Sequence, residues 1–274
     1  MTRTATDVDA RYVDLLKRTL TGTAGATYDV VIPRSRLHRL VLSPLQRLLA
    51  RRGYELLRRS DPKVSAQGIG WTAVGDTMVG IARLEQLEAC VADVIADGIP
   101  GDFIETGVWR GGASIFMRAL LDVHGDSERL VWLADSFAGL PKPDAKRYPA
   151  DRGDRLWRQS DNLAVSLEQV RANFARHGLL DDRVRFLPGW FRDTLPDAPI
   201  ERLAILRLDG DLYESTIVAL DSLYDRLSVG GYVIVDDYAL PTCTAAITDF
   251  RRTHKIADPI VRVDWTGAHW RKSA

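Results

Sequence analysis

Two pairs of aspartates follow two apolar segments in the second half of the chain. Asp209 and Asp211 follow the segment that ends at Leu208, and Asp236 and Asp237 follow another. If both segments are neighbouring strands of a parallel sheet, these four carboxylates meet beyond one edge of that sheet. Carboxylates held so close repel one another and raise one another's pKa, and a divalent cation would remove the repulsion. The pattern therefore predicts a metal site.

The residue types also indicate which cation would bind. Carboxylate oxygens, completed by water or substrate, suit Mg²⁺ or Mn²⁺ better than Zn²⁺. Neither histidine nor cysteine stands beside the four aspartates in the sequence, which argues against zinc. A single aspartate at the end of a strand is commonly a helix cap. Helix capping is a less simple explanation for two such pairs on successive strands.

A glycine-bearing turn, Glu105–Gly112, follows the short apolar segment at Phe103. Such a turn lets the backbone approach a nucleoside closely, although tight packing of helix on strand would also require it. Enzymes that bind dinucleotides prefer G-x-G-x-x-G, whereas bulky Val108 and Trp109 occupy this turn. A carboxylate at Glu105 suits a ligand with an ammonium and a sulfonium group, such as S-adenosylmethionine.

A second acid, Asp135, ends the next apolar segment, about one βαβ unit further on. An acid at this place can accept hydrogen bonds from both ribose hydroxyls of an adenosine ligand, or it can cap a helix. Aromatic residues follow the third strand at Pro188–Phe191. They could stack on adenine or cover the sheet, and the sequence leaves both open.

The elements that must position these residues alternate between strand and helix from Gly101 onward. We expect strands at 103–104, 130–134, 184–187, 203–208, 232–235, 260–264 and 269–272, and helices at 113–123, 163–177, 213–227 and 244–252. This order predicts an α/β fold, a Rossmann-like, doubly wound, mostly parallel sheet. The last two strands, joined through Thr266 and Gly267, would form a terminal antiparallel hairpin.

The first part of the chain predicts an N-terminal helical extension. Helical periodicity covers 9–20 and 37–57, and a loop is expected over 60–75. A further helix, expected over 77–96, is the first helix of the catalytic domain. We divide the chain into an arm or lid, residues 1–75, and a catalytic domain, residues 76–274. The arm could cover the active site or pack on a second subunit. Its arginines are expected on a solvated helix face: Arg34, Arg36, Arg39, Arg47, Arg51, Arg52, Arg58 and Arg59.

The bulk composition excludes several classes of protein. The 274 residues include 37 basic and 37 acidic side chains, so no overall charge draws the chain to nucleic acid or to an anionic membrane. Cys90 and Cys243 are expected to be buried free thiols. The sequence shows neither a signal peptide nor an apolar stretch of membrane-spanning length, so we expect a cytoplasmic protein.

Taken together, the motifs resemble those of the macrocin O-methyltransferase family. The resemblance rests on ETGVWRGG from Glu105, ADSFAGLP from Ala134, PGWFRDTLP from Pro188, RLDGDLY from Arg207, and the pair at Asp236 with the tyrosine that follows. It covers residues from about Gly75 to the C-terminus and extends loosely into the arm. These segments are specific jointly rather than singly.

The resemblance implies an S-adenosylmethionine-dependent, Mg²⁺-dependent enzyme that methylates sugar hydroxyls on antibiotic-type scaffolds, commonly as a dimer or higher oligomer. Carried over to this sequence, it makes Glu105 and Asp135 cofactor ligands and Asp211 the general base. It makes Asp209, Asp236 and Asp237 the metal ligands. We expect the neighbouring motif positions to line the cofactor site: Thr106, Gly107, Ser136, Phe137, Gly189 and Trp190.

Three other functions remain to be tested against this one. A nicotinamide-dependent oxidoreductase could share the fold, but the chain lacks both G-x-G-x-x-G and a Tyr-x-x-x-Lys proton donor. A methyltransferase could act on a catechol or another non-sugar diol. A metal-dependent phosphohydrolase could use the four acids, although no phosphate-binding loop is evident.

Overall fold

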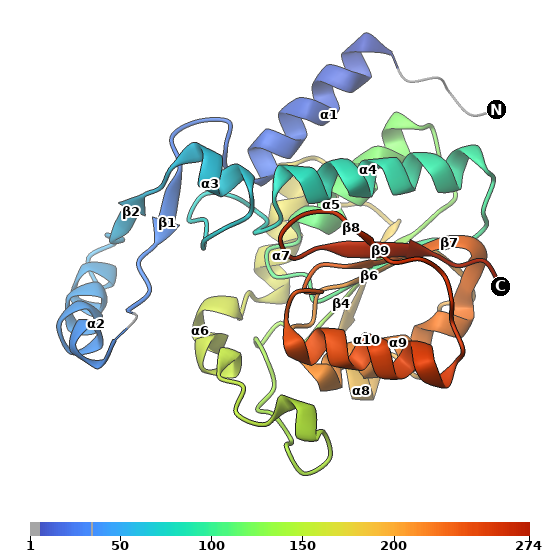
Figure 1. The fold of residues 1–274 in the computed structure, drawn as a ribbon. Coiled ribbons are helices and arrows are strands. Elements are labelled where there is room, and N and C mark those ends of the chain that lie inside the picture. Colours follow the sequence, from blue (N-terminus) through green and yellow to red (C-terminus); the bar gives the residue numbers. More distant parts are fainter. Residues whose placement is uncertain (1–5, 34) are drawn as a thin grey trace.

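A seven-stranded sheet forms the centre of the molecule in the computed structural model, which describes residues 6–33 and 35–274 (Figure 1). Its strands are β3 (Asp102–Thr106), β4 (Val131–Asp135), β5 (Val184–Pro188), β6 (Leu203–Leu208), β7 (Leu227–Val235), β8 (Val261–Arg262) and β9 (Ala268–Arg271). The order is β5-β4-β3-β6-β7-β9-β8, with β3 to β7 parallel and the last two strands antiparallel. The predicted fold class, including the terminal hairpin, is confirmed.

Helices cover both faces of this sheet. Residues of α1 (Asp7–Leu20), α4 (Ile81–Ala96), α5 (Gly112–Val123) and α7 (Leu167–Arg176) share one apolar core with the strands. The second core, on the other face, includes residues from α9 (Tyr213–Leu223) and α10 (Pro241–Thr253), next to the short α8 (Phe191–Thr194). Strand β6 is buried at every position, as expected of a central parallel strand between two helical layers.

The N-terminal arm projects from this body. Its two-stranded sheet pairs β1 (Tyr28–Val30) with β2 (Leu57–Arg59), and α2 (Arg36–Ala50) lies at its far end (Figure 1). The predicted helix over 37–57 is wrong beyond Ala50, because Gly53 takes a left-handed conformation and the chain returns to pair with β1. Arg34 and the side chains of Arg36 and Arg39 lie outside the described part of the structure. Arg47 is exposed on α2, as predicted. Arg51 and Arg52 are exposed just after α2, and Arg58 and Arg59 are exposed on strand β2 rather than on a helix.

Other element boundaries differ from the prediction for local reasons. A short helix, α3 (Pro62–Ala66), interrupts the predicted loop, since Asp61 caps it and Pro62 suits its first position. The helix expected from residue 77 begins at Ile81, because the Thr77 hydroxyl accepts the amide of Val79 and holds this stretch extended. The helix expected over 213–227 ends earlier, at Leu223, the last residue of α9.

The segment between β4 and α7 contains short elements that the sequence did not predict. It contains the 3₁₀ turns η1 (Pro149–Asp151) and η2 (Leu156–Gln159) and the single-turn helix α6 (Ser160–Leu163). Helix α7 then starts at Leu167, where Ser166 caps it by accepting the amide of Gln169. A further 3₁₀ turn, η3 (Tyr224–Arg226), joins α9 to β7.

Both cysteines are buried and free, as predicted. In the part of the chain that the structure describes, every helix is too short or too polar to cross a lipid bilayer.

Candidate active site

The carboxyl ends of three neighbouring strands lie level with one another. In the sheet register Thr106 of β3 is paired with Leu208 of β6, and Leu208 with Val235 of β7. The residues that follow these strands therefore leave the sheet side by side. Carboxylate oxygens of three of the predicted acids lie within 4.8 Å of one another: Asp209, Asp236 and Asp237.

Two buried arginines partly neutralise these acids. Arg207, inside β6, donates hydrogen bonds to Glu105, to Asp209 Oδ2 at 2.8 Å, and to Asp236. Arg83 of α4 donates to the other oxygen of Asp236 and, through Nε, to Asp264 at 3.0 Å. The cluster still holds more carboxylates than guanidinium groups.

The negative charge that the two arginines do not neutralise contributes to raised pKa values of the carboxyl groups. Burial, reinforced by the charge of Asp236, raises the pKa of Asp209 to about 6. Burial and the charges of Asp211 and Asp209 raise the pKa of Asp237 well above its usual value. Three closely spaced, partly uncompensated carboxylates are a donor set that fits a hard divalent cation.

Cys243 lies near the same cluster, which the sequence did not reveal. Burial, and then the charge of Asp237, raise the pKa of its thiol, and Thr216 Oγ1 lies 3.6 Å from its sulfur. A thiol that stays protonated is a poor metal ligand. The oxygen ligands therefore remain the candidates.

Asp211 lies beside the cluster rather than within it. Its backbone is left-handed, with φ of 59°, a conformation that is strained for a residue with a side chain. The Asp211 amide donates to Asp237 Oδ2 at 3.1 Å, and its carbonyl accepts from Thr242 Oγ1 at 2.7 Å. Burial, and the charges of Asp209 and Asp236, raise its pKa to about 7. The turn thus holds a weakly acidic carboxyl group at the wall of a cavity.

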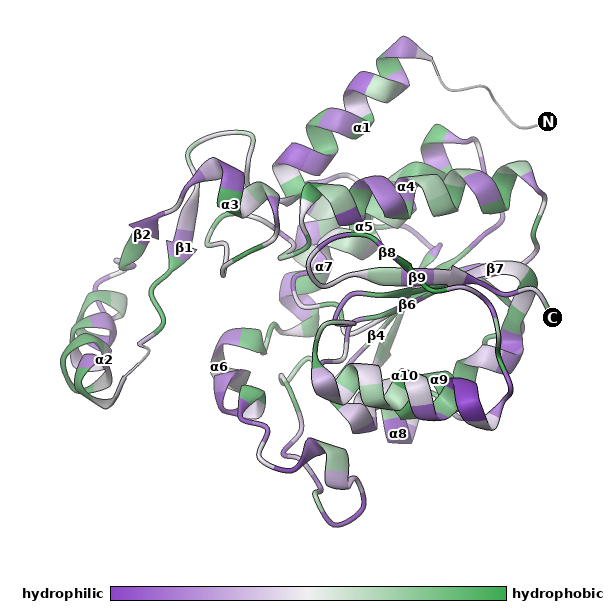
Figure 2. Ribbon diagram, in the orientation of Figure 1, coloured by the Kyte–Doolittle hydropathy of each residue, from purple (hydrophilic) through white to green (hydrophobic). Residues whose placement is uncertain are grey.

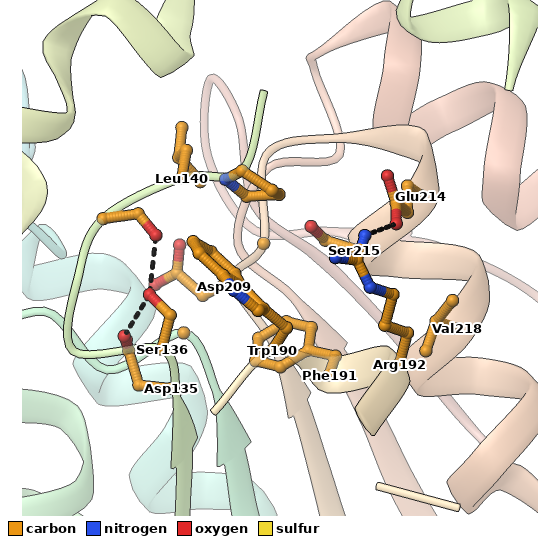
Figure 3. A pocket seen from close by; sticks show the side chains of 14 residues that line it. Asp135, Ser136, Leu140, Trp190, Phe191, Arg192, Asp209, Glu214, Ser215 and Val218 are labelled. Atoms are coloured by element: carbon orange, nitrogen blue, oxygen red, sulfur yellow. Dashed lines mark hydrogen bonds and ion pairs between the residues drawn. The ribbon is translucent and has the colours of Figure 1, made fainter. Parts of the chain in front are cut away.

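This cavity has a volume of about 330 Å³ and opens beyond the carboxyl ends of the strands. All four aspartates line it, together with Glu105, Gly107 and Asp135. A second, narrower slot adjoins it. The slot is lined by Gly107, Asp135, Ser136, Gly139, Leu140, Pro141, Trp190, Phe191, Arg192, Asp209, Gly210, Glu214, Ser215 and Val218 (Figure 3). The two spaces share an edge formed by Gly107, Asp135, Gly139, Leu140 and Asp209.

Gly107 allows the strand ends to come this close. Its φ is +88°, and a Cβ built there would lie 1.8 Å from the carbonyl oxygen of Asp209. Any side chain would therefore force β3 and β6 apart at their carboxyl ends. The following residues fix the turn: Trp109 Nε1 donates to the carbonyl of Asn162, and Arg110 Nη1 donates to the carbonyl of Gly75 at 2.8 Å.

Glu105 lines the cavity but is almost fully buried. Its carboxylate accepts from Arg207 and from Ser114 Oγ, and burial raises its pKa to about 7 although Arg207 opposes the shift. Contact of Glu105 with a cofactor stays a prediction. Among the other predicted cofactor residues, Thr106, Phe137 and Gly189 line neither space.

Asp135 links two turns at the shared edge. Its Oδ2 accepts the amide of Val108 and its Oδ1 accepts the amide of Phe137, both at 2.7 Å. Burial raises the pKa of Asp135 despite these bonds. Ser136 Oγ also donates to Oδ1, at 3.5 Å, so the second lone pair of Oδ2 is the one left to accept from a ligand hydroxyl.

Sequence reasoning missed Arg83, Arg207 and Glu214. Arg207 carried a signal, because a charged residue inside the apolar run of β6 must be paired when buried. Arg83 and Glu214 carried none, since each meets its partner through the fold alone: Arg83 meets Asp236, and Glu214 meets Arg192.

Comparison with known proteins identifies relatives over almost the whole chain. The sequence model of the family described as Macrocin-O-methyltransferase (TylF) matches residues 9–272. The chain is 51% identical over 274 residues to the 8-demethyl-8-(2,3-dimethoxy-alpha-L-rhamnosyl)-tetracenomycin-C 4′-O-methyltransferase of Streptomyces olivaceus, covering 100% of this chain and 96% of the relative. It is 52% identical over 212 residues to the demethyldecarbamoylnovobiocin O-methyltransferase of Streptomyces niveus, covering 77% of this chain and 81% of the relative.

Solved structures of methyltransferases also resemble this chain. The O-methyltransferase NovP superposes with a TM-score of 0.84 at 44% identity, covering 97% of this chain and 100% of NovP. The calicheamicin methyltransferase CalS11, with a TM-score of 0.57 and 19% identity over 98% of this chain and 95% of that one, shares the fold.

Proposed function

Because the chain belongs to the macrocin O-methyltransferase family, we propose that it transfers a methyl group from S-adenosylmethionine to a sugar hydroxyl of a natural-product glycoside. The observation that carries this proposal is the edge that the slot and the larger cavity share at Gly107, Asp135 and Asp209. A nucleoside in the slot and an acceptor in the cavity would meet there, above the three clustered carboxylates.

The slot fits the nucleoside half of the methyl donor. Asp135 stands where the remaining lone pair of Oδ2 would accept from a ribose hydroxyl. Trp190 and Leu140 also line the slot (Figure 3) and would enclose the flat adenine ring. When bound, S-adenosylmethionine supplies a methyl group on a sulfonium, whose positive charge the acidic edge favours.

Asp209, Asp236 and Asp237 would hold a divalent cation, for which we propose Mg²⁺. The cation supplies a positive charge that makes a nearby hydroxyl group more acidic. Asp211 is the candidate general base, because its carboxyl group lines the same cavity and its backbone is held by Asp237 and Thr242. Arg207 and Arg83 position the metal ligands by fixing both oxygens of Asp236.

The larger cavity suits a sugar that is attached to an apolar scaffold. Its acids can accept hydrogen bonds from sugar hydroxyls, and the rest of its wall is largely apolar: Trp71, Met78, Val79, Trp109, Leu156, Leu163, Leu240 and Trp265. Among the described residues of this wall, Arg83 is the one cationic side chain, and aspartates already engage it. Within the described wall no free cationic side chain would face a nucleoside diphosphate, so a glycoside is favoured over a nucleotide-bound sugar.

The arm contributes to this cavity and offers a surface for a second subunit. Gly68, Gly70 and Trp71, from the region assigned to the arm, form part of the cavity wall, in keeping with a lid. Large apolar side chains are exposed along α1 and α2, where Figure 2 shows hydrophobic residues on the projecting α2: Val8, Tyr12, Leu15, Leu37, Leu40, Val41, Leu45 and Leu48. We propose that a second copy of the chain covers this surface in a homo-oligomer.

Mass spectrometry of candidate acceptors tests the function. The purified protein is incubated with S-adenosylmethionine, Mg²⁺ and deoxysugar glycosides, with the same sugars as nucleoside diphosphates, and with a simple catechol. We expect a gain of one methyl group on a glycoside and little on the other two sets. Methylation of the catechol alone, or binding of NAD rather than S-adenosylhomocysteine in a thermal-shift assay, would overturn the proposal.

A further inference from the structure

One buried carboxylate oxygen in the slot lacks a partner. Glu214, in the first turn of α9, has a side chain that is 8% exposed. Its Oε1 accepts from Arg192 Nη1 at 3.2 Å, whereas its buried Oε2 has no hydrogen-bond partner among the described residues (Figure 3). A buried acceptor without a donor costs free energy unless a ligand supplies that donor.

The position of this oxygen is fixed by the backbone. Asp151 accepts the amide of Tyr213 through Oδ1 at 2.7 Å and the amide of Glu214 through Oδ2 at 3.0 Å. The aspartate thus caps the start of α9 and holds Glu214 in place. Arg192, in contrast, is about half exposed and donates to Oε1, so it supplies no donor to Oε2.

The surroundings of Glu214 select a flat, mainly apolar group. Leu140, Trp190, Phe191 and Val218 line the slot between Asp135 and Glu214. Gly210 keeps the slot open, because a Cβ there would lie 3.4 Å from the ring of Phe191 and 2.8 Å from Ser215 Cβ. A planar heteroaromatic ring is the group that such a space would hold.

We infer that Glu214 recognises the 6-amino group of adenine through Oε2 and makes the chain selective for adenine over hypoxanthine in the methyl donor. The inference rests on the proposed function, which puts S-adenosylmethionine in this slot. An amino group donates to the carboxylate, whereas the 6-oxo group of hypoxanthine presents a second acceptor to it. Like acceptors in a buried site repel, so Glu214 is a specificity-determining residue rather than a catalytic one.

Calorimetric titration with S-adenosylhomocysteine and S-inosylhomocysteine tests this inference without turnover. The protein with Glu214 intact should bind the adenosyl compound about tenfold to hundredfold more tightly. In Glu214→Ala the two affinities should agree within about threefold. In Glu214→Gln, whose amide can donate to a 6-oxo group, the preference should shrink or reverse. The matched control Glu201→Gln, at an exposed acid, should keep the full preference.

The outcomes separate the inference from the function on which it rests. If the unaltered protein binds neither nucleoside, the proposed function fails. If it binds both equally, or if Glu214→Gln keeps the preference for adenine unchanged, recognition by Glu214 is overturned while methyl transfer stands. Circular dichroism shows whether Glu214→Ala folds, and the Gln variant decides the matter if it does not.

Discussion

Glu105 and Arg207 stand opposite each other in the register of β3 and β6, and each side chain of their ion pair is only 2% exposed. The pair therefore lies inside the sheet, directly below the carboxylates that end the strands. Arg207 reaches from it to Asp209 and Asp236. The stability of the core and the geometry of the acidic site thus depend on one guanidinium group.

Replacing Arg207 with methionine should lower the free energy of unfolding by about 3–5 kcal/mol, because buried Glu105 would lose its cationic partner and Asp236 would lose one of its two. Urea denaturation measures the loss. The double variant Arg207→Met/Glu105→Gln should recover part of it. Arg252→Met, at an arginine whose side chain is 74% exposed, should change the stability by less than about 1 kcal/mol. An equally small effect at Arg207 would show that the pair is not structural.

Asp211→Asn should reduce turnover by about two to four orders of magnitude, since the amide cannot accept a proton from the acceptor hydroxyl. Binding of S-adenosylhomocysteine, followed by calorimetry, should stay within about threefold of the unaltered protein, as the metal ligands and the slot are retained. Asp193→Asn, at an exposed aspartate, is the control. Turnover near the normal rate in Asp211→Asn would remove this residue from the mechanism.

Removal of divalent cations by EDTA should abolish methyl transfer, and Mg²⁺ added in excess should restore it. The reason is that the proposed ligands leave a surplus of negative charge at the acceptor site. Asp237→Asn should raise the Mg²⁺ concentration needed for half-maximal activity. Full activity after chelation, with metal content checked by elemental analysis, would rule out the metal.

Asp135→Asn should weaken binding of S-adenosylhomocysteine by about 10- to 150-fold, the range for a lost hydrogen bond to a charged group. In the asparagine, an NH₂ group would replace one of the two oxygens that accept the amides of Val108 and Phe137. Part of the loss in affinity would therefore reflect a looser turn. Calorimetry gives the affinity, with Glu128→Gln as an exposed control. Unchanged affinity would place the ribose elsewhere.

Leu40→Asp should convert the proposed homo-oligomer to monomers, because Leu40 is 74% exposed on α2 and a charge there disfavours apolar contact. Size-exclusion chromatography with light scattering measures the mass of the particle. Val229→Asp, at an exposed valine outside the arm, should leave the mass unchanged. A monomer in the unaltered protein would refute the oligomer.

The sequence predicted a strand or helix accurately where its apolar pattern is continuous. The strand predicted at 203–208 matches β6 residue for residue, because a central parallel strand is apolar throughout. The helix predicted over 37–57 failed at its end. Leu56 and Leu57 continue the helical spacing, but Gly53 and the pairing of Leu57 with Val30 override it. Periodicity describes a segment well only where tertiary pairing does not compete with it.

The site was predictable where strand ends carry charge, and less so where a contact depends on the three-dimensional arrangement. Asp209, Asp236 and Asp237 could be grouped from the order of the strands alone. Arg207 meets Glu105 across 102 residues of sequence and Asp236 across 29. A local sequence pattern cannot predict contacts between residues so far apart in the chain. Nor can it predict that Oε2 of Glu214 has no partner among the described residues.

The contact between Gly107 and the Asp209 carbonyl bears on any effort to change which acceptors are methylated. A library that randomises position 107 would yield almost no active variants. Any side chain there would separate the carboxyl ends of β3 and β6, which carry residues of the site. The side chains of Trp71 and Trp265, in contrast, form part of the cavity wall itself. Directed evolution toward new scaffolds would gain most from diversity in that wall, with the glycine held constant.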